Sequence, residues 1–254
     1  MTSRGYDPIT LAAATEKVVV DGVRRKYVQL GRPLRFYGGT TSATEVGCNL
    51  RCKFCFSDKP VWKPKKTGKF YSPQEVFDGL ARSARKHGHK IISASASEGT
   101  IGREHLMALL DLVEVSEFVY VLETNGMILG NDSDYVSALS KYNRLHVRVS
   151  IKGDNPKQYH ELTGANPDSY ELPYIALKSL IAADVSCNAC LVASFSNGDG
   201  VRRVQQKLYD INPGILKSLE IEKITLFPKV AQRLADNNLW PSNFRTARQQ
   251  IYRK

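Results

Sequence analysis

Residues 45–56 read Glu-Val-Gly-Cys-Asn-Leu-Arg-Cys-Lys-Phe-Cys-Phe, which places Cys48, Cys52 and Cys55 in the spacing C-x3-C-x2-C. Three thiolates on one short loop can each bind one iron of a four-iron cluster. Such clusters usually take four cysteines, so three cysteines leave one iron open to a ligand from outside the protein. An open coordination position distinguishes a catalytic metal site from a structural one. The loop therefore predicts an iron–sulfur centre with a catalytic role.

Two alternatives to a cluster are a structural zinc ion and cysteines that bind no metal. Zinc needs a fourth ligand, and the histidines nearest in sequence, His87 and His89, lie far from the loop. The other two cysteines, Cys187 and Cys190, fall within a predicted strand, where an offset of three residues points side chains to opposite faces. We therefore expect this pair to be buried structural residues.

The composition describes an ordinary globular chain with a strongly basic balance. Among 254 residues, 36 Lys and Arg outnumber 25 Asp and Glu, which gives a net charge of +11. Such a charge predicts an anionic partner, namely a nucleic acid, a phosphorylated substrate or an acidic protein, with a merely basic surface as the alternative. No apolar run reaches the roughly 18 residues of a membrane span, and residues 1–22 do not resemble a secretory signal. We expect a cytoplasmic protein that has no membrane partner and, with an odd number of cysteines, no disulfide framework.

Strand-like and helix-like regions alternate along the chain. The predicted strands are Thr41–Val46, Lys90–Ser97, Phe118–Leu122, Leu145–Ile151, Ser186–Ser194 and Leu219–Leu226. The predicted helices run from a capping box at Ser72 to a stop at Gly88, then over Glu104–Val113, Ser133–Tyr142, a turn led by Pro156, Tyr170–Ala183 and Val201–Tyr209. This alternation predicts an α/β fold of parallel strands with right-handed crossovers, either doubly wound or closed toward a barrel.

The fourth predicted strand favours a barrel. Its apolar residues alternate with His146, Arg148, Ser150 and Lys152, so one face is polar. A strand covered by helices on both faces would be apolar on both, whereas a polar face fits a lined cavity, or alternatively an edge strand. We divide the chain into an N-terminal extension (1–35) with added strands at Val18–Val20 and Lys26–Leu30, a partial barrel (36–228) and a C-terminal basic tail (229–254), whose end, Asn243–Lys254, we expect to be helical or disordered.

The cysteine loop, together with Phe54 directly before the third cysteine, resembles the signature of the radical S-adenosylmethionine (SAM) superfamily. The resemblance implies a partial (βα)6 TIM-like barrel. It also implies a 4Fe–4S cluster on Cys48, Cys52 and Cys55, with the amino and carboxylate groups of SAM on the open iron and Phe54 near the adenine. Reduction of the cluster would cleave SAM to a 5′-deoxyadenosyl radical, which abstracts hydrogen from a substrate.

Three strand ends resemble SAM contacts of that superfamily. Ser95-Ala-Ser-Glu-Gly99 stands where the family has Gly-Gly-Glu, with Ala and Ser in place of the glycines. Glu123-Thr-Asn-Gly126 and Ser150-Ile-Lys-Gly153 are similar to segments of glycyl-radical activating enzymes. The cofactor-binding residues implied in this way are Phe54, Ser97, Glu98, Glu123, Asn125, Ser150 and Lys152. The alternatives are an acid at a helix start, an Asn-Gly turn and a polar stripe.

Three functions follow as hypotheses. The resemblance favours an activating enzyme that abstracts hydrogen from a protein glycyl residue. The charge of +11 and the lysine-rich segment Lys59–Lys69 with Trp62 favour an RNA (tRNA) modification enzyme. A non-catalytic iron–sulfur electron carrier is the third, although a carrier would not need the SAM-contact positions. The expected partners are thus a protein or RNA substrate and a low-potential electron donor such as ferredoxin or flavodoxin.

Overall fold

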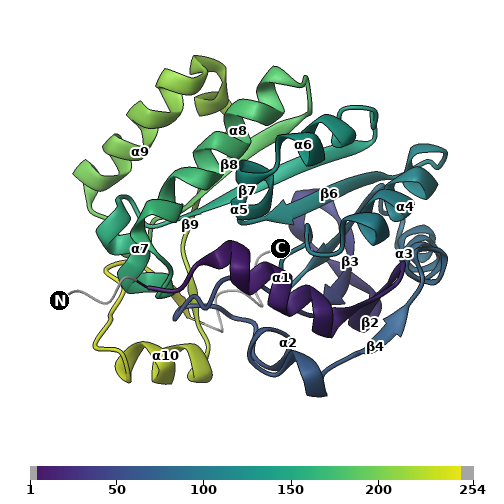
Figure 1. Cartoon of the computed structure of the whole chain (residues 1–254), viewed down its shortest axis with the longest axis horizontal. Helices are drawn as coiled ribbons and strands as arrows, with labels where there is room; N and C mark the ends of the chain where they lie inside the picture. Colours follow the sequence, from purple (N-terminus) through teal and green to yellow (C-terminus); the bar gives the residue numbers. More distant parts are fainter. Residues whose placement is uncertain (1–4, 247–254) are drawn as a thin grey trace.

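One mixed sheet runs through the computed structural model, which describes residues 5–246 (Figure 1). Its parallel strands are β3 (Thr40–Glu45), β5 (Ile91–Ser95), β6 (Val119–Thr124), β7 (Leu145–Lys152), β8 (Cys187–Val192) and β9 (Glu220–Glu222). They pair in sequence order, with no reversal of strand order as in a doubly wound sheet. β9 does not pair back to β3. The predicted α/β fold with a partial (βα)6 barrel is therefore confirmed.

Three further strands extend the sheet beyond β3. They are β1 (Val20–Asp21), β2 (Arg24–Leu34) and β4 (Lys69–Tyr71), and β2 pairs antiparallel with the other two and with β3. The prediction of a strand at Lys26–Leu30 is confirmed by β2. The prediction of a strand at Val18–Val20 is wrong for its first two residues, which end helix α1 (Pro8–Val19). Asp7 caps this helix by accepting from the N–H of Ile9 and Thr10, and that start signal outweighs the strand preference of the valines.

Most helices follow the strands as the alternation predicts, but those at Lys59–Trp62, Met127–Asn131 and Pro228–Ala235 were not predicted. The helices after α1 are α2 (Lys59–Trp62), α3 (Pro73–His87), α4 (Arg103–Glu114), α5 (Met127–Asn131), α6 (Ser133–Leu139), α7 (Pro156–Thr163), α8 (Leu172–Ala182), α9 (Gly198–Ile211) and α10 (Pro228–Ala235), with 3-10 turns η1 (Phe36–Gly38), η2 (Pro64–Lys66), η3 (Pro167–Glu171) and η4 (Pro213–Ser218). The capping box on α3 is confirmed, with Ser72 and Glu75 each bonded to the other's backbone, and Gly88 ends the helix in a left-handed conformation. None of the helices in the described range is long and apolar enough to cross a membrane.

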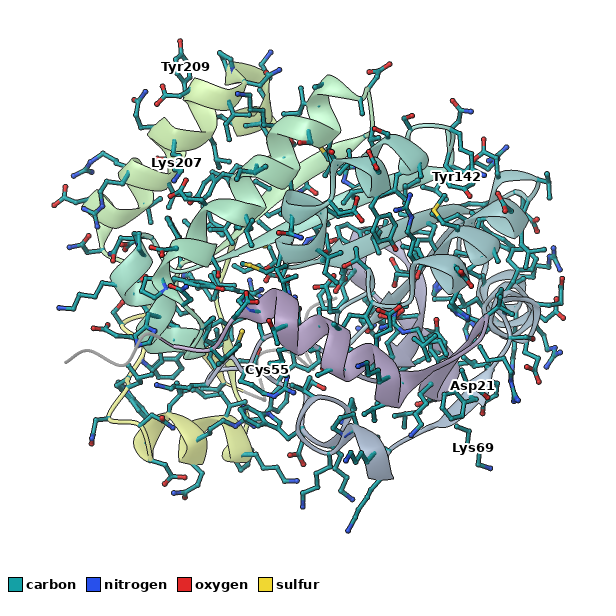
Figure 2. The ribbon with its side chains drawn as sticks, in the orientation of Figure 1. Asp21, Cys55, Lys69, Tyr142, Lys207 and Tyr209 are labelled. Atoms are coloured by element: carbon teal, nitrogen blue, oxygen red, sulfur yellow. The ribbon has the colours of Figure 1, made fainter. Side chains whose placement is uncertain are left out.

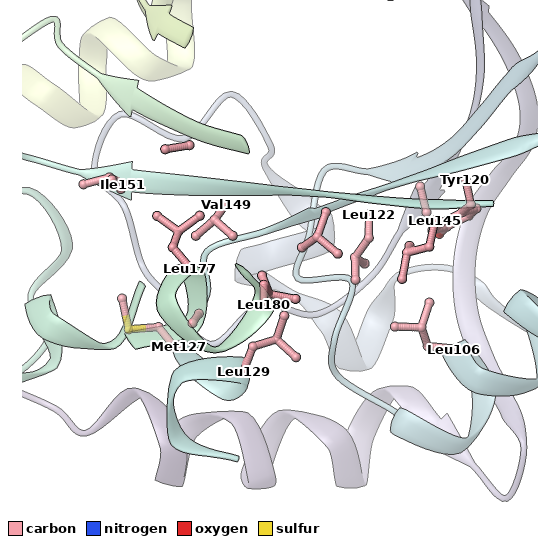
Figure 3. Packing of buried hydrophobic residues seen from close by; sticks show 14 of the residues in the cluster. Leu106, Tyr120, Leu122, Met127, Leu129, Leu145, Val149, Ile151, Leu177 and Leu180 are labelled. Atoms are coloured by element: carbon pink, nitrogen blue, oxygen red, sulfur yellow. The ribbon is translucent and has the colours of Figure 1, made fainter. Parts of the chain in front are cut away.

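The two faces of the parallel strands have opposite character. Leu122, Val149 and Ile151 point to the helices and pack with Leu177 and Leu180 of α8 (Figure 3). The opposite face carries the polar set. Register pairs join Glu123 to Arg148, Arg148 to Asn188, Ser150 to Cys190, and Cys190 to Glu220. Since adjacent residues at one register share a face, the polar side chains of four strands line the inside of the open barrel.

The last predicted strand is shorter than expected. In place of Leu219–Leu226, β9 ends at Glu222, and β10 (Thr225–Leu226) pairs with β11 (Arg245–Thr246) in a separate two-stranded sheet. The chain leaves the barrel here because the N–H of Ile224 donates to the Ser194 hydroxyl (2.8 Å) instead of continuing the ladder. β11 lies within the segment 243–254, predicted to be helical or disordered, whose residues 247–254 lie outside the described range.

Residues on both sides of the proposed barrel boundaries pack into the molecule. Val19 forms a small apolar cluster with Val46 and Ile101. Val230 and Leu234 of α10 belong to the main core, which means that the chain after residue 228 begins as a packed helix. The division at residues 35 and 228 remains a proposal about organisation.

Candidate active site

The cysteine loop leaves the carboxyl end of β3 and is held by contacts from distant segments. Gly47 has φ 97° and lies so close to α1 that a Cβ would approach Thr15 and Val19 to 2.8–2.9 Å. Only glycine fits this position without strain. The N–H of Lys53 donates to the carbonyl of Leu162 (2.9 Å), and this bond ties the loop to the end of α7. The loop is therefore fixed at the edge of the barrel where the parallel strands end.

The three thiols are free of disulfides; Cys52 is buried, and Cys48 and Cys55 are half-buried. Burial raises the pKa of all three, and that of Cys52 to about 12, while the charge of Lys152 acts in the opposite direction on Cys52 and Cys55. Because a thiol binds metal as the thiolate, these groups need a cation to be ionised at neutral pH. Figure 2 shows Cys55 beneath α1, on the side of the molecule where α10 lies.

Asn125, at the end of β6, contacts the cysteine loop as the resemblance implies. Its amide Nδ2 donates to Oδ1 of Asn49 (2.7 Å) and lies 3.9 Å from Sγ of Cys48. Asn49 is fully buried, and its own Nδ2 has no protein partner. The position after the first cysteine was not identified from the sequence, since a lone Asn in a loop carries no specific signal.

Both carboxylate oxygens of Glu98 accept hydrogen bonds, and these bonds connect the segments that follow β5 and β6. Oε1 accepts from the hydroxyl and N–H of Thr100 (2.7 and 3.2 Å) and from the hydroxyl of Thr124 (2.6 Å), and Oε2 accepts from the N–H of Asn125 (2.8 Å). The side chain is 1% exposed. Its evident role is to hold the loops after β5 and β6 together, and direct contact with SAM stays a prediction.

The loop before Glu98 turns through a left-handed residue at one of the two positions where the family has glycine. Ala96 adopts φ 76°, a left-handed conformation that costs a residue with a Cβ about 1–2 kcal/mol. The hydroxyl of Ser97 donates to the carbonyl of Glu45 (2.9 Å), which anchors the second substituted position to β3. The two departures from Gly-Gly are therefore compatible with a glycine-like turn, at some cost in strain.

Arg25 binds the backbone of the loop that follows β5, a role that was not identified from the sequence. It lies on β2, is fully buried, and its guanidinium donates to the carbonyls of Glu98 (2.7 Å), Gly99 (2.9 Å) and Ile101 (2.5 Å). Its Nη1 also lies 3.5 Å from Oε1 of Glu45, which is equally buried. An arginine 73 positions before its acceptor leaves no local pattern that could reveal the contact.

Lys152 brings a positive charge from the end of β7 toward the thiols. Its ammonium donates to the hydroxyl of Ser150. Burial raises the pKa of Glu123, on the neighbouring strand, with Arg148 and Lys152 opposing the effect. The predicted residues Glu123, Ser150 and Lys152 therefore share the polar interior of the barrel, next to the cysteine loop.

Arg148 organises the deeper part of this interior. Its Nη2 donates to Glu220 (2.8 Å), Glu222 (2.7 Å) and Sγ of Cys190 (2.9 Å). Cys190 thus belongs to the polar face, while Cys187 packs against the apolar core, and the prediction that the pair points to opposite faces is confirmed.

Phe54 lies beside the segment that follows β8. Its ring is 8% exposed and packs at a tilt on Phe195, with 5.6 Å between centroids. This contact leaves the predicted stacking of Phe54 near the adenine untested. Arg233 of α10 donates to the carbonyl of Cys55 (2.8 Å), so the C-terminal helix buttresses the third cysteine.

The donor set fits a cluster better than a single metal ion. The Sγ atoms of Cys48, Cys52 and Cys55 do not all lie within 4.8 Å of one another, whereas thiolates on one tetrahedral zinc are about 3.8 Å apart for Zn–S bonds of about 2.3 Å. An anionic cluster with an outside ligand suits three thiols at this spacing, the buried Nδ2 of Asn49 that has no protein partner, and the cation of Lys152. No group of three or more mutually close metal-binding side chains in the described range combines these cysteines with a histidine.

An open parallel barrel with three clustered thiols at its carboxyl edge defines a class of metal-dependent enzymes. Residues 44–197, more than half of the chain, match the Radical SAM superfamily. The chain belongs to this superfamily, whose members are enzymes, and its cofactors are a 4Fe–4S cluster and S-adenosylmethionine.

The similar proteins vary in what they act on. A probable GTP 3′,8-cyclase of Methanococcus vannielii is 28% identical over 120 residues, which are 47% of this chain and 38% of that protein. Streptococcus suis SuiB superposes with a TM-score of 0.56 at 16% identity, over 81% of this chain and 47% of SuiB. A spore photoproduct lyase variant superposes with a TM-score of 0.55 at 16% sequence identity, over 77% of this chain and 60% of the lyase chain. The chain thus covers less than half the length of the first two, and both structural likenesses concern the fold.

Proposed function

We propose that this protein is a radical SAM enzyme in which Cys48, Cys52 and Cys55 hold the 4Fe–4S cluster. The observation that carries the proposal is the set of three thiols on one loop, with Cys52 buried and Cys48 and Cys55 half-buried, and with the charge of Lys152 acting on Cys52 and Cys55. When bound, the cluster and SAM supply a 5′-deoxyadenosyl radical, which abstracts hydrogen from a substrate. The protein's own residues hold these groups in place and orient them.

The experiment is anaerobic reconstitution with iron and sulfide, reduction with dithionite, and measurement of 5′-deoxyadenosine released from SAM. We expect Cys48→Ala, Cys52→Ala and Cys55→Ala each to abolish release. Cys187→Ala is the matched control, since its thiol packs against the apolar core, and it should keep full activity. Full turnover by any of the three loop variants would overturn the cluster assignment.

For the substrate, we infer a glycyl residue in a protein chain. The segments ending in Gly126 and Gly153 support this inference, because their similarity to activating enzymes comes with side chains that meet near the cysteine loop. SuiB has been crystallised with a precursor peptide, which is consistent with a peptide chain at such a barrel. The test is incubation with a glycyl-radical enzyme under turnover conditions, in which electron paramagnetic resonance should detect a stable protein radical.

An RNA substrate is the second candidate, favoured by the net charge of +11. Binding to bulk tRNA should then weaken steeply as salt rises, because each phosphate contact releases a counterion. Weak and salt-independent binding would remove the support for this candidate. A cytoplasmic location and a ferredoxin or flavodoxin as electron donor belong to the same proposal.

A further inference from the structure

An open cavity of about 500 Å³ lies between α1 and the segment 62–66, outside the barrel. Leu11 and Val18 of α1 form an apolar wall. The opposite wall carries Lys63, Lys65 and Lys66, all exposed. We call this feature, with Arg51 and Trp62 at its base, the basic groove. In Figure 1, α2 and the chain that follows it lie below α1.

The basic groove reaches the backbone of the first cluster cysteine. The hydroxyl of Thr15, in the α1 wall, lies 3.5 Å from the carbonyl oxygen of Cys48. Nη1 of Arg51 donates to the same carbonyl (2.6 Å) and to that of Leu50 (3.0 Å). A molecule seated in the groove is therefore separated from a cluster ligand by one layer of side chain. It does not need to enter the barrel, where a substrate must meet SAM.

The charge of the groove is not compensated within the described part of the chain. No ion pair joins Lys63, Lys65 or Lys66 to an acid there. The terminal stretches outside that part, 1–4 and 247–254, contain basic residues and no acidic one, so they do not complement the groove. A second copy, with its own charge of +11, is repelled by it. The occupant must be an acidic molecule.

Trp62 favours a protein over a nucleic acid as this occupant. The guanidinium groups of Arg233 and Arg51 already lie over its ring, 5.1 and 5.9 Å from the centroid. Trp62 is 37% exposed, and because two guanidinium groups already contact its ring, it offers less area for stacking bases, on which single-stranded nucleic-acid sites depend. An apolar wall beside a basic rim instead matches a protein interface with steering charges.

We propose that the basic groove docks an acidic, low-potential electron-donor protein. The proposal rests on the proposed function, because the cluster must gain an electron before SAM is cleaved. In the transfer the donor loses one electron and the cluster gains one, and no covalent bond or proton changes place. Thr15 and Arg51 stand between the docked donor and Cys48, and the lysines steer the donor to the groove.

The test compares Lys63→Glu/Lys65→Glu/Lys66→Glu with a matched control, Lys86→Glu/Lys178→Glu/Lys217→Glu. The control has the same change of net charge on exposed lysines of α3, α8 and η4. An acidic ferredoxin is the probe. Its binding is measured by calorimetry on cluster-loaded and cluster-free protein, and cluster reduction is followed after mixing with pre-reduced ferredoxin or with dithionite.

We expect wild-type binding to weaken as salt rises from 50 to 500 mM. The groove variant should bind ferredoxin at least tenfold more weakly than wild type, and its cluster should be reduced by ferredoxin at least tenfold more slowly. The control variant should stay within twofold of wild type in both measurements. Dithionite should reduce the cluster of all three proteins equally. Equal behaviour of the groove and control variants with ferredoxin, or no binding by wild type, would overturn the proposal. So would a groove variant that loses tRNA binding but keeps ferredoxin binding. Groove-dependent binding without any 5′-deoxyadenosine from dithionite-reduced wild type would instead refute the proposed function and leave docking standing.

Discussion

Replacing Arg25 by Met should destabilise the protein by about 3–5 kcal/mol, the usual cost of breaking a buried ion pair from one side. The fully buried guanidinium donates to three carbonyls, at 2.5–2.9 Å, and lies 3.5 Å from Glu45. Methionine fills much of the space of the arginine stem but provides no donor. The three carbonyls lose their partner, and the carboxylate of Glu45 is left buried without a counter-charge.

The measurement is anaerobic urea unfolding of wild type and variants, followed by circular dichroism, with the transition midpoint and slope compared. For a chain of this size, a loss of 3–5 kcal/mol corresponds to a melting temperature roughly 6–20 °C lower. Because Arg25 holds the carbonyls of the loop that begins with Ala96, SAM binding to the reconstituted variant should weaken as well. Arg24→Met is the matched control, since Arg24 lies exposed one residue earlier on β2.

A double-mutant cycle measures the interaction free energy between Arg25 and Glu45. Glu45→Gln removes the charge that Arg25→Met strands, so the double variant should lose at least 1 kcal/mol less than the sum of the single losses. Strict additivity, or a loss below about 1 kcal/mol for Arg25→Met alone, would refute the reasoning that this buried pair supports the loop.

Three more predictions concern single sites. Ala96→Gly should stabilise the protein by up to about 1 kcal/mol, since glycine adopts φ 76° freely; a lower urea midpoint would show that the loop is not left-handed. Burial lowers the pKa of His105 to about 4. As pH falls, this imidazole therefore becomes protonated near pH 6.5 in the unfolded chain but only near pH 4 in the folded protein. About 3 kcal/mol of stability is therefore present above pH 6.5 and lost as pH falls to 4. His105→Gln should flatten this part of the stability profile, and an unchanged slope would contradict the assignment. The Cys187→Ala/Cys190→Ala double variant should keep the iron content of wild type, and iron loss would mean that the pair binds metal.

Much of the fold could be read from local patterns. The Ser72 capping box, the strand–helix alternation and the polar face around Arg148 each act within a few residues, and each corresponds to an observed feature. The errors came where a distant partner competes. Val18 and Val19 joined a helix that Asp7 starts, and the last strand ended where Ser194 binds Ile224.

In the candidate site, too, some residues were predicted from the sequence and other contacts were not. The cysteines were predicted from their spacing, and Asn125 and Lys152 from the resemblance of two strand ends to a known family. These positions meet because the carboxyl ends of parallel strands lie at one edge. For Glu98, contact with SAM stays a prediction. The sequence did not indicate that its carboxylate accepts hydrogen bonds from Thr100, Thr124 and Asn125, because this arrangement depends on two loops from different strands.

By itself, the sequence determined the order of the six parallel strands, the C-x3-C-x2-C loop and the polar lining of one sheet face, because these depend on spacing along the chain. Only the tertiary structure decided that Arg25 supports the loop after β5, that α10 buttresses Cys55 and that a basic groove lies behind Cys48. These contacts join residues 33 to 178 positions apart. Burial and hydrogen bonding at such separations follow from how the chain packs, and no local pattern of residues encodes them.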